Sequence, residues 1–208
     1  MPADWQIIYY NNDIACNLAI AWNTSKISLV NSKSVLLPMP KKQTFIWRFT
    51  NYYGLQLQRG ALTAVFSVNG KSLRITNVHL ACEANMAHRA KQLKYLLEDL
   101  NKQNIENEIL VGDFNTVGLS TFRRSQEKKV EQALGEAYKN IFPNIKWTLD
   151  TSDFDPRDGY GKFLACMKIR FRVRLDYIFS KNLKLIVAEE MTNIAGSDHR
   201  PLLASFEV

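Results

Sequence analysis

Four short polar segments carry side chains that can bind metal ions, hold phosphate groups or transfer protons. They are NVHL at 77–80, VGDFNT at 111–116, RLDYIFS at 174–180 and GSDHRP at 196–201. The last segment places Ser197, Asp198 and His199 side by side. A serine hydrolase brings its catalytic residues together from separate segments, and the chain has no GxSxG motif. This segment therefore favours metal binding by Asp198 and proton transfer by His199.

The segment NVHL lies at the end of a predicted strand. Leu73 and Ile75 mark the core face of that strand, and alternation puts Asn77 and His79 on the same face. Polar groups at such positions need hydrogen-bond partners or open into a cleft. The segment by itself is compatible with part of a site and with a buried, fully bonded histidine.

The segment VGDFNT follows a short apolar run at 109–111 that is typical of a buried strand. If the chain stays extended, Asp113 and Asn115 point the same way. A carboxylate and an amide at the carboxyl end of a central strand often belong to a site. The alternative is a turn in which each side chain bonds to nearby backbone.

The segment KIRFRVRLDYIF at 168–179 is predicted to form a strand that runs from Lys168 to Ser180. Alternation collects its polar residues on one face, namely Lys168, Arg170, Arg172, Arg174 and Asp176. A row of cations suits a polyanion such as a phosphate backbone, although a charged edge strand shows the same pattern. Asp176 is the exception in this row and is held by Arg174 or orients a nearby histidine.

The composition is that of one globular domain with an excess of basic residues. The 208 residues carry a formal net charge of +7, which favours an anionic partner such as nucleic acid or a phosphate-bearing lipid surface. No apolar run approaches a membrane span, and the N-terminus does not resemble a signal peptide. The three cysteines lie far apart and match no metal-binding spacing. We expect a monomer in the reducing cytoplasm.

The elements that must position these segments are mainly strands. The expected strands include 17–21, 26–30 and 202–208, and residues 31–60 are expected to form long loops or edge strands. Two strand-like runs flank Asn69-Gly70, the preferred pair for a tight hairpin. Helical periodicity is seen at 86–102, and 126–141 is a second helix candidate. This pattern predicts a sheet-rich layered fold of the α/β or α+β class.

In this order, the four segments resemble the endonuclease/exonuclease/phosphatase superfamily. That superfamily includes deoxyribonuclease-like nucleases, abasic-site endonucleases, neutral sphingomyelinases and inositol polyphosphate 5-phosphatases. RGALTAVF at 59–66 resembles the family's strand before the histidine. The resemblance covers roughly residues 17–208. It implies a single α+β domain over 1–208, a four-layer α/β/β/α sandwich of two mixed sheets with helices outside.

The resemblance also implies roles for individual residues in Mg²⁺-dependent hydrolysis of a phosphoester, with Mn²⁺ as a possible substitute. It assigns metal binding and water activation to Asp113 and Asp198, and positioning of the nucleophile or phosphate to Asn115. It makes His79 a phosphate contact and an acid, and it makes Asp176 the residue that orients His199 as the base. The expected substrate-binding residues are Asn77, Arg59, Arg174 and Ser197.

The chain departs from the family pattern at its beginning. The family starts with a strand that carries an Asn and continues to a strand that carries a metal-binding Glu. Neither motif is found here, and no Glu precedes Glu83. The family's serine-arginine pair has Ser25-Lys26 as its nearest equivalent. We therefore expect a domain that lacks its first strands, with weak Mg²⁺ binding and low or no activity.

The leading hypothesis from the sequence is a metal-dependent nuclease that cleaves phosphodiesters in nucleic acid. A second hypothesis keeps the chemistry and changes the substrate to an anionic phospholipid or a small phosphoester such as an inositol phosphate. A third is a non-catalytic fragment that only binds anions. Endonucleolytic and exonucleolytic cleavage are both compatible with these motifs.

Overall fold

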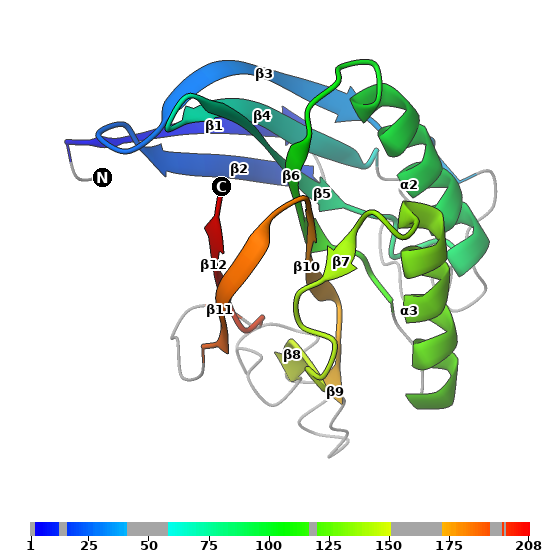
Figure 1. Ribbon diagram of the computed structural model, residues 1–208. Coiled ribbons are helices and arrows are strands. Elements are labelled where there is room, and N and C mark those ends of the chain that lie inside the picture. The colour runs from blue at the N-terminus through cyan, green and yellow to red at the C-terminus, as the bar shows by residue number, and fades with distance from the viewer. Residues whose placement is uncertain are drawn as a thin grey trace.

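The computed structural model describes residues 3–12, 16–40, 58–116, 120–150, 172–191, 197 and 199–208. Its central feature is a six-stranded sheet with the order β3-β4-β5-β6-β10-β7 (Figure 1). The strands are β3 (Ser28–Leu36), β4 (Gly60–Val68), β5 (Lys71–His79), β6 (Asn107–Asp113), β10 (Asp176–Lys181) and β7 (Lys139–Asn140). The β5–β6 pair is parallel and the other pairs are antiparallel, so the sheet is mixed.

The predicted hairpin forms at Asn69-Gly70 and joins β4 to β5. Both turn residues have positive φ angles, 50° at Asn69 and 78° at Gly70. This is the conformation that a two-residue type I′ turn requires, and it matches the twist of the flanking strands. The turn sets a register in which Val68 pairs with Lys71 and Ala61 pairs with Val78. The prediction of a tight hairpin is therefore confirmed.

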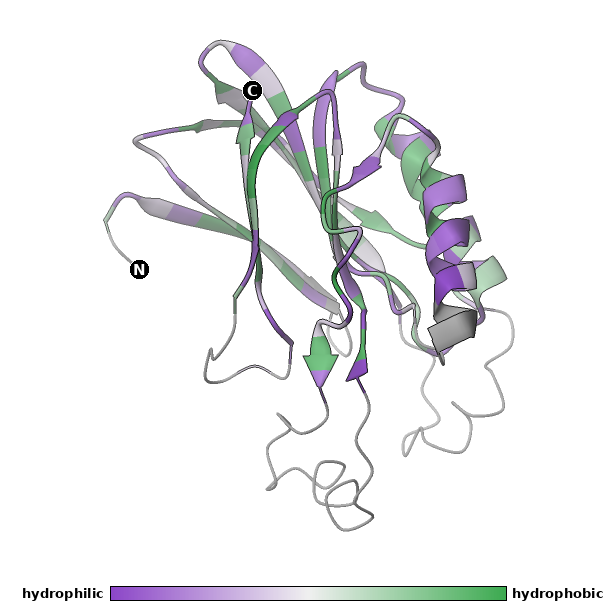
Figure 2. Ribbon diagram, turned by 60° about the horizontal axis from the view of Figure 1, so that its bottom comes forward, coloured by the Kyte–Doolittle hydropathy of each residue, from purple (hydrophilic) through white to green (hydrophobic). Residues whose placement is uncertain are grey.

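Two helices cover one face of the sheet, α2 (Met86–Leu100) and α3 (Ser120–Leu134) (Figure 1). The predicted period of α2 is confirmed, because Leu93, Leu96 and Leu100 are buried against the sheet. In Figure 2 both hydrophobic and hydrophilic residues appear on the helices, as amphipathic surface helices require. The helix predicted at 126–141 instead ends at Leu134, since Gly135 takes a φ of 78° that terminates the helix.

The opposite face of the sheet is covered by a hairpin of β1 (Trp5–Asn12) and β2 (Cys16–Asn23). Alternating residues of β2 face β4, and this second core contains Leu18, Ile20, Trp22, Leu62, Ala64 and Phe66. The Trp22 and Phe66 rings meet edge to face, with centroids 5.5 Å apart. The strand predicted at 17–21 is confirmed and extended, whereas β1 was not expected from the sequence.

A second hairpin on this side consists of β11 (Lys184–Glu190) and β12 (Leu202–Glu207) (Figure 1). The strand predicted at 202–208 is confirmed as β12. Figure 2 shows a hydrophobic stretch in β11, whose Ile186 side chain is exposed. The sequence pattern does not predict β11 as a strand, because its apolar residues run consecutively and show no alternation.

The structure is of the mixed α/β type that the sequence predicted, with two differences in detail. Among the described residues the helices form a layer on one face only, so the layers are helices, six-stranded sheet and hairpins. The strand predicted from Lys168 to Ser180 is divided where it is described. β9 (Arg172–Val173) pairs with β8 (Leu149–Asp150), and β10 then begins at Asp176 and pairs with β6. Lys168 and Arg170 lie outside the described residues.

Candidate active site

Three of the predicted site residues form one row across adjacent strands of the central sheet. His79 ends β5, Asp113 ends β6 and Asp176 begins β10. The parallel register pairs His79 with Asp113, and the antiparallel register pairs Asp176 with Asp113. Residues paired across neighbouring strands have side chains close together on the same face. The sheet therefore collects an imidazole and two carboxylates from three distant segments.

Gly112 allows the strands to approach at this edge. It has a φ of 136°, and a Cβ atom added there would lie 1.9 Å from the Val78 carbonyl oxygen. A side chain at this position would collide with backbone that cannot rotate away. The glycine of VGDFNT therefore has a steric role, which sets the geometry of the strand end that carries Asp113.

Asp113 and Asn115 form a turn in which their side chains point to different partners. The Asn115 backbone N–H donates to Asp113 Oδ1 at 2.8 Å, and the Asn115 Nδ2 donates to the Leu80 carbonyl at 2.9 Å. Asn115 has a φ of 50° and is buried. The extended continuation considered from the sequence is wrong, because the left-handed conformation of Asn115 turns the chain. In this turn Asn115 braces the Asp113 carboxylate.

His199 is paired with Asp176, as the resemblance implies. Its Nδ1 lies 2.7 Å from Asp176 Oδ2. The backbone N–H of His199 donates to the Ser197 hydroxyl oxygen at 3.1 Å, so Ser197 holds the loop that presents the histidine. Because Nδ1 faces a carboxylate, proton transfer by this imidazole must use Nε2.

Thr148, which was not predicted as a site residue, supports this pair. Its hydroxyl oxygen accepts hydrogen bonds from the backbone N–H groups of Leu175, at 3.0 Å, and Asp176, at 3.1 Å. Its carbonyl accepts from the Arg200 N–H at 2.7 Å, and Leu149 forms a β-bridge with His199. Thr148 therefore ties together the segments that carry Asp176 and His199. No motif marks such a threonine, since its partners are backbone groups distant in the sequence.

The pKa values of Asp113 and His79 are both shifted toward their neutral forms, and a cation bound beside Asp113 would stabilise its ionised carboxylate. Burial, together with the charge of Asp176, raises the pKa of Asp113 from 3.8 to about 7. Burial and the Arg59 guanidinium lower the pKa of His79 from 6.5 to about 4. A neutral imidazole donates hydrogen bonds but carries no extra proton at neutral pH, which argues against His79 as the acid.

The substrate-binding candidates occupy three different environments. Asn77 donates to the Ala19 carbonyl at 3.1 Å and thereby links β5 to β2. Arg59 is 3% exposed and lies against His79, with 3.0 Å between Nη1 and Nε2. Arg174 is buried, with its guanidinium 4.1 Å from the Tyr177 ring centroid and 3.0 Å from Asn140 Oδ1.

Arg174 therefore does not lie with Asp176, as alternation along a continuous strand predicted. The break between β9 and β10 turns its side chain toward Tyr177, which belongs to the core beneath the helices. A guanidinium enclosed on that side cannot reach a substrate at the row of His79, Asp113 and Asp176. The contacts of its guanidinium with Tyr177 and Asn140 are structural.

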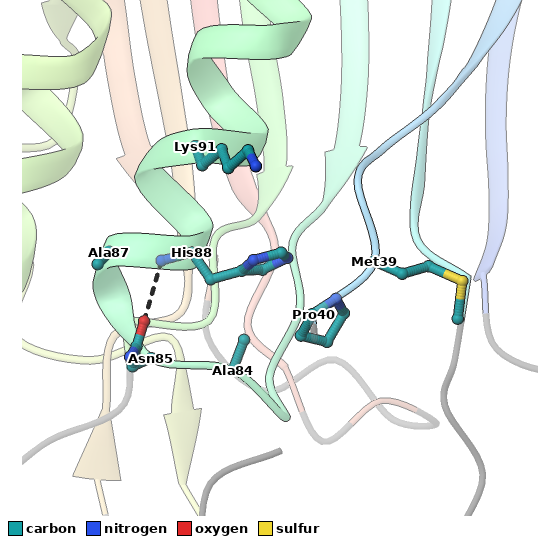
Figure 3. A pocket seen from close by; sticks show the side chains of 7 residues that line it. All are labelled: Met39, Pro40, Ala84, Asn85, Ala87, His88 and Lys91. Carbon is teal, nitrogen blue, oxygen red and sulfur yellow. Dashed lines mark hydrogen bonds between the residues drawn. The ribbon is translucent and has the colours of Figure 1, made fainter. Parts of the chain in front are cut away.

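Two cavities lie near these residues. One, of about 380 Å³, is lined by Gly112, Asp176, Ser197, His199 and Arg200 among others, and it opens beside the His199–Asp176 pair. The other, of about 490 Å³, lies at the start of α2 (Figure 3). There His88 and Lys91 from the helix face Met39 and Pro40, and His88 Nε2 lies 3.0 Å from the Pro38 carbonyl oxygen. The second cavity contains none of the predicted site residues.

The donor chemistry suits a divalent cation only in part. Mg²⁺ and Mn²⁺ prefer oxygen ligands, and Asp113 offers a carboxylate whose protonation an adjacent cation would oppose. Within the part of the chain that the structure describes, no group of three or more His, Cys, Asp or Glu residues is arranged to hold a metal ion. Asp198, the other predicted ligand, lies outside the described residues.

Comparison of the fold with solved structures gives three informative matches. The D. rerio protein TDP2, solved with a single-stranded DNA product, is 16% identical with a TM-score of 0.68, covering 99% of this chain and 78% of that one. An endonuclease/exonuclease/phosphatase from Bacteroides vulgatus is 16% identical with a TM-score of 0.69, covering 99% and 77%. A Bacteroides thetaiotaomicron mannosyl-6-phosphatase is 16% identical with a TM-score of 0.62, covering 99% and 78%.

These identities establish a common fold and leave the substrate open. No curated protein matches the chain in a sequence search. Among the described residues, no helix is long and apolar enough to cross a membrane. A family model does match residues 10–199, which include all the predicted site residues. This chain belongs to the endonuclease/exonuclease/phosphatase family.

Proposed function

We propose that this chain is a divalent-metal-dependent phosphodiesterase that acts on nucleic acid. The observation that carries the proposal is the Asp176–His199 pair, with 2.7 Å between Oδ2 and Nδ1, beside Asp113 in the same row. An oriented imidazole next to a carboxylate that favours a cation is the minimum that metal-assisted attack of water on a phosphoester requires.

In this proposal each side chain has one role. Asp176 holds His199 in the tautomer that carries its hydrogen on Nδ1, so Nε2 takes the proton from the attacking water. Asp113 and Asp198 would hold Mg²⁺ or Mn²⁺, and Asn115 keeps the Asp113 carboxylate in place through the turn. The metal ion, when bound, supplies positive charge against the phosphoryl oxygens. His79 donates a hydrogen bond to one of those oxygens.

Nucleic acid is the preferred substrate class for two reasons. The net charge of +7 favours a polyanion. The structurally similar D. rerio protein was solved with a single-stranded DNA product. The similar Bacteroides phosphatase is named for a sugar phosphate, so a small phosphoester is the principal alternative. An anionic lipid head group offers the same phosphoryl chemistry.

The test is hydrolysis by the purified chain of single-stranded and duplex DNA, an inositol phosphate, a sugar phosphate and sphingomyelin vesicles. Each assay is run with Mg²⁺, with Mn²⁺ and with a chelator. We expect slow cleavage of DNA, in keeping with the incomplete set of metal ligands among the described residues, that requires the metal and disappears in Asp113→Asn and His199→Ala. The matched control is His88→Ala, because His88 lies in α2 outside the row. Cleavage of only a small phosphoester, or metal-independent activity, would contradict the proposal.

A further inference from the structure

A third cavity, of about 500 Å³, adjoins the cavity that opens beside the His199–Asp176 pair. Its lining includes the side chains of Lys146 and Trp147. Arg200, which follows His199 in the chain, lines both cavities. A ligand longer than a single phosphoryl group can therefore extend from the His199–Asp176 pair toward Trp147 by passing Arg200.

The Trp147 ring is in contact with two guanidinium groups. Arg200 Cζ lies 3.3 Å from the ring centroid, and Arg172 Cζ lies 4.6 Å from it. An arginine side chain that stacks on an aromatic ring keeps its charge at every physiological pH and has its planar fork of N–H groups held in one orientation. The indole thus brings two permanent positive charges to one place.

Each of these guanidinium groups has one carboxylate partner and further donors. Arg172 Nε donates to Asp150 Oδ2 at 2.7 Å, and Arg200 Nη1 donates to Glu190 Oε1 at 2.9 Å. Within the described ranges, neither guanidinium has another hydrogen-bond acceptor, although 47% of the Arg172 side chain and 25% of the Arg200 side chain are exposed. The remaining N–H groups suit a phosphate, because arginine donates two parallel hydrogen bonds to such an anion.

The backbone connects this cluster rigidly to the candidate active site. The Thr148 carbonyl accepts from the Arg200 N–H at 2.7 Å, and the Thr148 hydroxyl accepts from the Asp176 N–H at 3.1 Å. Trp147 precedes Thr148 in the chain, as His199 precedes Arg200. The segments that orient the His199–Asp176 pair therefore also position the ring and one of its two guanidinium groups.

We propose that Arg172 and Arg200, stacked on Trp147, form a second phosphate subsite, which holds a phosphate of a nucleic-acid strand next to the phosphodiester at the row. Its role as a substrate subsite rests on the proposed function, whereas binding of the strand requires no catalysis. Phosphate contacts position a strand without reading its bases, so the subsite favours a polymer of any sequence over a small phosphoester.

This subsite also gives a role to one member of the predicted cationic strand. Arg174 of that strand is buried against Tyr177, whereas Arg172 is exposed beside Trp147. Its ion pair with Asp150 does not argue against phosphate binding, because partly exposed ion pairs are weak and a guanidinium fork has room for both anions.

The test is equilibrium binding of a fluorescein-labelled oligo(dT) in chelator, measured by anisotropy over a range of salt concentrations. We expect the Kd of the double variant Arg172→Ala, Arg200→Ala to rise at least about tenfold, the effect of losing hydrogen bonds to a charged group. The slope of log Kd against log salt concentration should become shallower by about 0.7, the value for one phosphate contact on a single strand.

The matched control is the double variant Lys71→Ala, Lys184→Ala, which removes the same charge from places remote from the row. Lys71 begins β5, which ends at His79, and Lys184 follows the end of β10 opposite to Asp176. Both lysines already have a partner within the described residues, as the two arginines do. This control should bind the oligonucleotide with the Kd and the salt slope of the parent.

Two further variants separate the fork and the ring from simple charge. Arg172→Lys, Arg200→Lys keeps both charges but loses the planar fork, so its Kd should still rise. Trp147→Leu keeps apolar bulk and both arginines but removes the stacking surface, and it should weaken binding more than Trp147→Phe does. Thermal melts establish that each variant is folded before its Kd is compared.

Unchanged binding in the double arginine variant, or an equal loss in the lysine control, would overturn the inference. So would a parent chain that binds phosphatidylserine vesicles and no oligonucleotide, which would assign the cluster to a membrane surface. DNA cleavage with binding that is independent of the two arginines would leave only the proposed function standing. Arginine-dependent binding without hydrolysis of any substrate would support the subsite as a strand-binding site and count against the proposed function.

Discussion

Asp113 and Asp176 are direct partners on adjacent antiparallel strands, so two carboxylates occupy neighbouring positions on one face of the sheet. Their environments differ. Asp176 is bonded to His199, whereas Asp113 accepts a backbone N–H from Asn115 and has its pKa raised to about 7. Asp176 therefore orients the His199 imidazole, whereas the ionised form of Asp113 would be stabilised by a bound cation.

Removing the imidazole of His199 should abolish most of the activity. General acid–base catalysis contributes about 10²- to 10⁴-fold, so His199→Ala should lower kcat by a factor in that range. Asp176→Asn should lower kcat as well, because an amide can present its N–H groups to Nδ1 and favour the wrong tautomer. Steady-state kinetics beside His88→Ala tests this, and full activity in His199→Ala would contradict it.

Asp113 should make the stability of the metal-free chain depend on pH. Its pKa is raised from 3.8 to about 7 on folding, so the unfolded chain loses this proton at lower pH than the folded chain. The protonated Asp113 carboxyl group therefore stabilises the folded chain fully below about pH 4, and this stabilisation is lost as the pH rises toward 7. Above about pH 7 the free energy of unfolding no longer changes because of this group. Because an amide does not titrate, the melting temperature of Asp113→Asn relative to that of the parent should increase as the pH rises from about 4 to about 7. Thermal melts in chelator test this, and a pH-independent difference would contradict it.

Gly112→Ala should destabilise the fold severely. The added Cβ would lie 1.9 Å from the Val78 carbonyl oxygen, in addition to the strain of a φ of 136°. We expect a loss of more than about 3 kcal/mol in the free energy of unfolding, in the range of core disruption. Gly70→Ala is the control, because φ is also positive but no atom lies within 4 Å of the added Cβ. It should cost about 1 kcal/mol, the strain of a left-handed residue alone. If urea unfolding gave the same loss of unfolding free energy for Gly112→Ala and Gly70→Ala, the close approach to the Val78 carbonyl would not be the cause of the destabilisation.

Thr148→Val should reduce both stability and activity. It removes the acceptor for the N–H groups of Leu175 and Asp176, and an unsatisfied buried polar group costs about 1–3 kcal/mol. The strand end that carries Asp176 should then shift, which lowers kcat. Thr63→Val is the control, since Thr63 bonds to Thr76 in the interior away from this edge. It should lower the melting temperature without lowering kcat in the folded enzyme. Unimpaired kcat in Thr148→Val would show that this threonine does not position Asp176.

Local sequence patterns were sufficient to predict the β4–β5 hairpin and helix α2. Asn69-Gly70 predicted the hairpin because few residue pairs adopt two positive φ angles in succession. The apolar period of α2 predicted the buried leucines for the same kind of local reason. The end of α3 was misplaced because Gly135 interrupts a segment whose composition otherwise suits a helix. β1 and β11 were missed because their pairing partners, rather than their own alternation, stabilise them.

The sequence by itself determined the family and predicted the candidate reacting groups, since motif order and residue type are properties of the chain. Only the tertiary structure decided how these groups meet. The strand registers place His79, Asp113 and Asp176 in one row, and the interruption of the strand between β9 and β10 turns Arg174 away from it. Burial then converts Arg59 from an expected phosphate contact into a partner of Glu83 and His79. These outcomes depend on desolvation and on contacts between residues far apart in sequence, which no local pattern encodes.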